Sequence, residues 1–78
     1  MPDTPSLDMR GVLCPTNWVY IKLKLEDLAA GDTLEVLLDD GEPMRNVPRS
    51  VKSEGHRILQ VHPEGEGYYR LLIQRGKD

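Results

Sequence analysis

The chain has 78 residues and a mass of 8.8 kDa, so it can hold one small domain, which buries only ~60–65% of the surface that its unfolded form exposes. The net charge of −3 argues against direct nucleic-acid binding, which needs basic residues to neutralise phosphates. Hydrophobic residues make up 38% and charged residues 29%, which is typical of a folded domain. No apolar run approaches the ~20 residues that a membrane span requires.

The first expected elements follow a lead-in over residues 1–5, which its two prolines predict to be disordered. Alternation of Leu7 and Met9 with polar neighbours predicts a short strand, ended by Gly11 and followed by a loop. A helix should come next, with Thr16 or Asn17 as its N-cap. Four residues at helical spacing predict its buried stripe, namely Trp18, Ile21, Leu25 and Leu28. Ala29, Ala30 and Gly31 should close it, with Gly31 in the left-handed position after the last turn.

The second half of the chain predicts one helix and three strands. Leu34, Val36 and Leu38 alternate in a strand over residues 33–38, and residues 39–42 form a turn. Asn46 is the expected cap of the second helix, with Pro48 in its first turn. That helix ends at Gly55 and carries Met44, Val47 and Val51 on one face. Strands over residues 57–62 and 68–74 complete the order β-α-β-α-β-β. We therefore expect an α+β fold, a two-layer α/β sandwich with a mixed four-stranded sheet and both helices on one face.

The single cysteine, Cys14, is the first candidate functional residue. One thiol excludes an internal disulfide, a Cys-x-x-Cys redox pair and a Cys-rich zinc site. Two interpretations of Cys14 remain: a buried inert thiol or a lone nucleophile. Pro15 follows it and a helix starts just beyond, so the positive end of the helix dipole would stabilise a thiolate there. A thiol with no export signal at the N-terminus fits the reducing cytoplasm.

Other polar groups have a structural interpretation beside the functional one. Asp39 and Asp40 are adjacent, so they point to opposite faces of a strand and are expected to form a solvated turn rather than an acid–base pair. Lys22 and Lys24 lie on the first helix, away from its apolar stripe. They are either a solvated face or a cationic patch that lowers the pKa of the Cys14 thiol or meets an acidic partner.

Taken in order, these residues resemble the TusA/SirA/YedF family of small sulfur-carrier proteins, from about Leu7 to Gly76. The resemblance begins with Leu7-Asp8-Met9-Arg10-Gly11 and Cys14-Pro15, which match an Arg-Gly pair followed by the family's Cys-Pro-x-Pro. It continues through Gly31-Asp32-Thr33-Leu34, Arg45-Asn46-Val47-Pro48 and Gly55-His56. It implies one domain over residues 6–76 with the same sandwich fold.

The resemblance also implies a chemistry. Cys14 would accept sulfane sulfur as a persulfide, and Arg10, Gly11, Pro15 and Asn17 would position it. Lys22 would be a basic contact for a partner. The expected partners are a cysteine desulfurase or another sulfane-sulfur donor, and a downstream acceptor protein in tRNA thiolation, molybdenum-cofactor synthesis or other sulfur metabolism. No cofactor, no metal, no nucleic acid and no membrane are implied, and we expect a cytoplasmic monomer.

Three positions depart from the family pattern. Asn17 replaces the second proline of the motif, Leu23 occupies a commonly basic helix position, and Asn46 replaces an aspartate. These changes leave the expected fold intact and point to a divergent branch with its own donor and acceptor. Two alternatives remain at this stage. One is a SirA-like regulatory or interaction module whose thiol is not used chemically, and the other is a relative that carries selenium on the same thiol.

Overall fold

The computed structural model describes residues 4–13 and 15–76. Its elements are, in chain order, β1 (Ser6–Asp8), α1 (Thr16–Glu26), β2 (Thr33–Asp39), α2 (Glu42–Ser53), β3 (Arg57–Pro63) and β4 (Tyr68–Gln74). The predicted order and fold class are confirmed. The lead-in and the domain bounds stay predictions, since residues 1–3 lie outside the described part. Neither helix in that part is long and apolar enough to cross a membrane.

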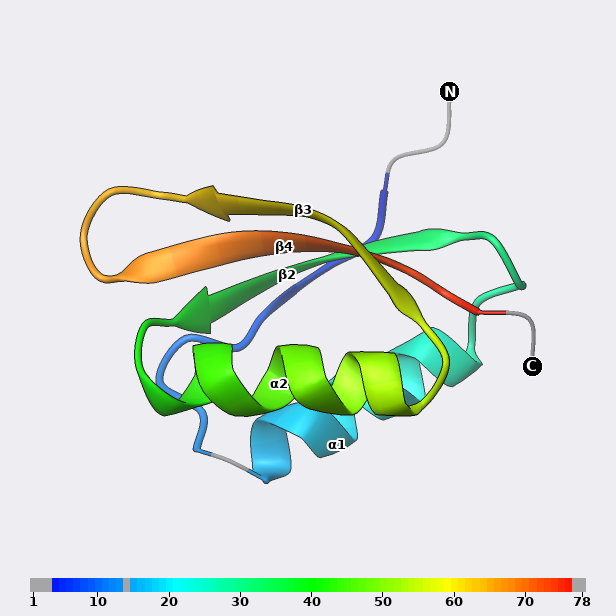
Figure 1. Ribbon diagram of the computed structural model, residues 1–78, viewed down its shortest axis with the longest axis horizontal. Helices are drawn as coiled ribbons and strands as arrows, with labels where there is room; N and C mark the ends of the chain where they lie inside the picture. Colours follow the sequence, from blue (N-terminus) through cyan, green and yellow to red (C-terminus); the bar gives the residue numbers. More distant parts are fainter. Residues whose placement is uncertain (1–3, 14, 77–78) are drawn as a thin grey trace.

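The sheet has the strand order β1-β2-β4-β3. β1 runs parallel to β2, whereas β4 is antiparallel to both β2 and β3. A parallel pair needs a crossover connection, which α1 supplies between β1 and β2. Both helices lie against the same face of the sheet, and no helix of the described residues covers the opposite face (Figure 1). The result is the expected two-layer sandwich.

The core lies between the sheet and the two helices. Alternation along the strands points one set of side chains at the helices, as predicted. Ten residues form this core: Met9, Ile21, Leu25, Leu34, Val36, Leu38, Val47, Val51, Leu71 and Ile73. All but Met9 are fully buried, and each such aliphatic side chain contributes about 1.5–3 kcal/mol relative to an exposed one. The predicted stripe and strand faces therefore account for most of the core.

The ends of α1 differ from those predicted. The N-cap residue is Pro15, and no side chain makes a capping hydrogen bond, so neither Thr16 nor Asn17 is the cap. The helix stops at Glu26, because the amides that follow it bond three residues back instead of four, at Asp27 and Leu28. Gly31 therefore lies in a separate turn over residues 29–32 and does not close the helix.

The start of α2 also differs from the prediction. The helix begins at Glu42, directly after Gly41, with Pro43 in its first turn. Proline is favoured there because its missing N–H would have no helical partner. Asn46 and Pro48 consequently lie inside the helix rather than at its start. The predicted C-terminal end is confirmed, since α2 stops at Ser53, just before Gly55.

Candidate functional site: the loop before α1

A tight turn over residues 9–12 follows β1 and leads towards α1. The Met9 amide donates to the Leu37 carbonyl at 2.9 Å, which ties the turn to β2, and the Val12 amide donates to the Met9 carbonyl at 3.2 Å. Gly11 sits at the corner with φ of +79°, a conformation that costs other residues about 1–2 kcal/mol. The glycine of the Arg-Gly pair is thus required by the shape of the turn.

Arg10 and Asp8 form a bidentate ion pair at the same turn. The Arg10 Nε and Nη2 atoms donate to the two Asp8 carboxylate oxygens at 2.9 and 2.7 Å. Mainly through the side-chain hydrogen bond, Arg10 lowers the pKa of Asp8 to about 2, and Asp8 raises the pKa of Arg10 above its usual range. The guanidinium also lies 4.5 Å from the centre of the Tyr68 ring, a cation–π contact that reaches β4.

Asp39 makes a further connection that the sequence did not indicate. Its Oδ2 atom accepts a hydrogen bond from the Gly11 amide at 2.6 Å, between residues that lie 28 apart in the chain. The expectation that residues 39 and 40 form a solvated turn is therefore wrong for Asp39. For Asp40 it holds locally, because that carboxylate is exposed and accepts a hydrogen bond from the next amide, that of Gly41.

The first turn of α1 begins beside the cysteine position. The Asn17 amide donates to the Leu13 carbonyl at 3.0 Å, and the Val19 amide donates to the Pro15 carbonyl at 3.1 Å. Cys14 itself lies outside the described residues. Its neighbours Leu13 and Pro15 are both exposed, so the chain reaches the protein surface on either side of it.

Asn17 faces the core instead of capping the helix. It is spaced four residues from Ile21 and eight from Leu25, so all three share one helix face, and all three are fully buried. The Asn17 Oδ1 atom accepts from the Trp18 amide at 2.6 Å, but Nδ2 has no hydrogen-bond partner in the described residues. A buried donor without a partner costs about 1–3 kcal/mol.

The outer surface next to this loop is apolar. Leu13 is 81% exposed, and Val19, Tyr20 and Leu23 on α1 are each about half exposed, at 50, 52 and 56%. A groove of about 300 Å³ runs between β1 and α1, lined by Leu7, Met9, Tyr20, Leu23, Lys24 and Asp27. Lys22, the predicted partner contact, is half-buried on the same helix and forms no ion pair with another described residue. The arrangement is suited to contact with a protein surface.

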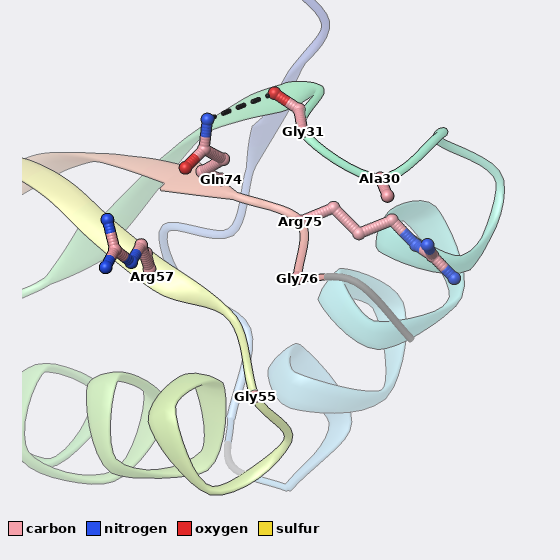
Figure 2. Close-up of a pocket in the computed structure, with 7 residues that line it drawn as sticks. All are labelled: Ala30, Gly31, Gly55, Arg57, Gln74, Arg75 and Gly76. Atoms are coloured by element: carbon pink, nitrogen blue, oxygen red, sulfur yellow. Dashed lines mark hydrogen bonds between the residues drawn. The ribbon is translucent and has the colours of Figure 1, made fainter.

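A larger cavity, of about 560 Å³, lies where β2 begins and β4 ends. Figure 2 shows its seven lining residues and the hydrogen bond from Gln74 Nε2 to the Gly31 carbonyl at 3.2 Å. The guanidinium groups of Arg57 and Arg75 point away from each other there. The C-terminal ends of both helices lie close by (Figure 1), and their partial negative charge disfavours an anion. Among the described residues, no three metal-ligating side chains cluster anywhere.

Comparison with known proteins places the chain in a family. The pattern of the family described as "Sulfurtransferase TusA" matches residues 6–75. The chain belongs to the TusA family. A putative sulfur carrier protein of Archaeoglobus fulgidus is 44% identical over 69 residues, which cover 88% of this chain and 78% of that protein.

Two further similar proteins extend the comparison. The sulfur carrier protein TusA of Pseudomonas putida is 32% identical over 72 residues, covering 92% of this chain and 89% of its own. The crystal structure of a SirA-like protein from Desulfitobacterium hafniense superposes with a TM-score of 0.81 at 23% identity, over 95% of this chain and all of that one. These findings support a sulfur-carrying role as the function class and confirm the SirA-like fold.

Proposed function

We propose that the chain is a sulfur carrier that holds sulfane sulfur as a persulfide on Cys14. The observation that carries the proposal is the match to the TusA family over residues 6–75, together with Cys14-Pro15 at the matching place in the sequence. The fold agrees with it, because α1 starts at Thr16, two residues after the cysteine. The positive end of the helix dipole stabilises a nearby thiolate or persulfide anion.

The proposed transfer needs one thiol on each protein and no cofactor. The Cys14 thiolate attacks the outer sulfur of a persulfide on the donor protein. A new S–S bond forms at Cys14, the donor's S–S bond breaks, and the donor cysteine leaves as a thiolate. In the second step a nucleophile of the acceptor protein takes that outer sulfur, and Cys14 returns to the thiolate. We propose a cysteine desulfurase or another sulfane-sulfur donor for the first step, and a cytoplasmic setting, which keeps the thiol reduced.

The exposed apolar surface next to the loop supports docking with such partners. Leu13 directly precedes Cys14 and is 81% exposed, so a protein that brings its own sulfur to Cys14 must also meet Leu13. Lys22 on α1 is our candidate basic contact at the same interface. We propose that the protein acts as a monomer, which leaves this surface available to a donor and an acceptor in turn.

Mass spectrometry tests the proposal directly. After incubation with a cysteine desulfurase and free cysteine, the wild-type chain should gain the mass of one sulfur atom, which a reducing agent removes again. Cys14→Ser should gain nothing while it unfolds at the same denaturant concentration as the wild type. If no sulfane-sulfur donor adds sulfur to the wild type, the proposal is wrong.

A second candidate function is a regulatory or interaction module whose thiol is not used. The apolar surface of Val19, Tyr20 and Leu23 favours it, since a binding surface serves such a module whether or not the thiol reacts. The two candidates differ in their response to Cys14→Ala. A carrier loses its cellular function with this variant, whereas an interaction module keeps it.

A further inference from the structure

We propose that Asp39 is a positioning residue for Cys14, which acts by fixing the turn that leads to the cysteine. The inference rests on the proposed sulfur-carrier function and adds a residue to it. Asp39 lies at the end of β2 and the turn follows β1, so the residue links the loop to a central strand of the sheet. It would set how Cys14 is presented to the sulfur of a partner protein.

The hydrogen bond from Gly11 is the first step of the argument. Within the turn, the amide of Val12 makes the closing bond to the Met9 carbonyl. The Gly11 amide has no part in that bond and is available to a second acceptor. Asp39 Oδ2 provides it at 2.6 Å, a short distance of the kind expected when the acceptor is a carboxylate.

The place of Asp39 in the sheet is the second step. It follows Leu38, which is fully buried, and it stands opposite Tyr68 of β4 in the sheet register. The Arg10 guanidinium lies over the ring of that same Tyr68. Two neighbouring corner residues of the turn, Arg10 and Gly11, are therefore held by a facing pair of residues on β2 and β4.

The ion pair between Asp8 and Arg10 cannot replace this link. Its two members lie two residues apart, so it joins Arg10 only to the end of β1, which reaches β2 through the strand pairing. Among the described residues, the turn itself reaches β2 directly through the hydrogen bond from the Met9 amide to Leu37 and through the hydrogen bond from the Gly11 amide to Asp39. Loss of the carboxylate releases the Gly11 amide, from which the chain continues to Cys14.

Sulfur transfer between two proteins is sensitive to such a change, because the two sulfur atoms must meet in line. Misplacement by about 1 Å can slow an oriented reaction by up to ~100-fold. We expect Asp39→Ala to slow sulfur acceptance from the donor protein by about tenfold. Alkylation by iodoacetamide needs no docked orientation, so its rate at Cys14 should change by less than about twofold.

The experiment compares three variants. Asp39→Ala removes the acceptor, and Asp39→Asn keeps an acceptor oxygen but loses the charge, so it should restore the transfer rate to within about threefold of wild type. Asp32→Ala is the matched control. Asp32 also accepts a backbone hydrogen bond, from the Ala29 amide at 3.0 Å, but it lies in the turn between α1 and β2. This control should transfer sulfur at the wild-type rate.

Hydrogen exchange of the Gly11 amide, followed by NMR, separates this inference from the proposed function. The amide should be protected in the wild type and in Asp39→Asn, and should exchange about tenfold faster in Asp39→Ala. If that variant does not fold, Asp39→Ser, whose shorter side chain does not reach Gly11, takes its place. Failure of the wild type to accept sulfur would refute the carrier function, whereas the exchange data would still decide whether Asp39 holds the turn.

Two results would overturn the role of Asp39. One is a folded Asp39→Ala variant that accepts sulfur at the wild-type rate or keeps the Gly11 amide protected. The other is an Asp39→Asn variant that is as slow as Asp39→Ala, because the hydrogen bond would then not be what positions the loop.

Discussion

Substitution of Gly11 by alanine tests the turn before Cys14 most directly. Gly11 has φ of +79°, and a Cβ atom added there would meet nothing within 4 Å. The cost is therefore backbone strain alone, about 1–2 kcal/mol. The lower conformational entropy of the unfolded alanine chain offsets about 0.4–1 kcal/mol of it. The net loss is about 1 kcal/mol, which lowers the Tm of a domain of this size by ~4–8 °C.

Gly31 provides the matched comparison. It has φ of +91° and equally open surroundings, but it lies between α1 and β2, in the turn that lines the cavity of Figure 2. Gly31→Ala should lose the same stability as Gly11→Ala, within about 0.5 kcal/mol. Only Gly11→Ala should slow sulfur acceptance, by about tenfold, since only this variant strains the turn that leads to Cys14.

Thermal unfolding followed by circular dichroism measures the stability of both variants. Mass spectrometry at timed intervals after mixing with the persulfide-loaded donor gives the rate of sulfur acceptance, at a temperature where both variants remain folded. Equal rates for the two variants, at equal loss of stability, would refute the view that this turn positions the cysteine. An unchanged Tm for Gly11→Ala would refute the strained backbone conformation itself.

Four further predictions concern pH, the core and the interface. Arg10 lowers the pKa of Asp8 from 3.8 to about 2. The ion pair should therefore stabilise the fold above about pH 4 and lose this effect as the pH falls through about 2. The urea midpoints of wild type and Arg10→Gln should differ above about pH 4 and converge as the pH falls to about 2. Leu25→Ala should lower the free energy of unfolding, measured in urea, by about 2–5 kcal/mol because the Leu25 side chain is fully buried. Leu13→Ala should lower it by less than about 0.5 kcal/mol but should slow sulfur transfer. A wild-type transfer rate for Leu13→Ala would exclude Leu13 from the interface. Asn17→Ala should cost less than Leu25→Ala, about 1 kcal/mol, because it also removes an unpaired buried donor; an equal or larger loss would show that the Asn17 amide is satisfied in solution.

The sequence predicted the architecture because each element carries its own periodicity. Leu34, Val36 and Leu38 alternate as strand residues do, and Ile21 and Leu25 repeat as helix residues do, and all five are buried as expected. These patterns depend only on neighbours in the chain, which is why the order of elements along the chain and the two layers could be inferred from them. The family resemblance, now shown over residues 6–75, added the chemistry that periodicity does not contain.

The sequence was less informative about helix ends and about Asp39. Asn17 is a good capping residue by type, but tertiary packing decided its place, since the helix face it shares with Ile21 is the buried one. The prediction that Asn46 caps α2 was also wrong, because α2 starts about one turn earlier, directly after Gly41 and with Pro43 in its first turn. The hydrogen bond between Gly11 and Asp39 joins residues that lie 28 apart in the chain, and no local sequence pattern predicts such a contact.

The two edges of the sheet bear on how the protein behaves at high concentration. Strands β1 and β3 form these edges, and β3 exposes Leu59 and Val61, at 44 and 51%. Long, regular and apolar edges invite another chain to add a strand, which leads to aggregation. Here β1 has only three residues, and a shift in register between Ile58 and Gln60 interrupts the ladder of β3. Such irregularity makes a poor template for a second chain, so these edges should resist strand addition while the protein meets its partners through its other surfaces.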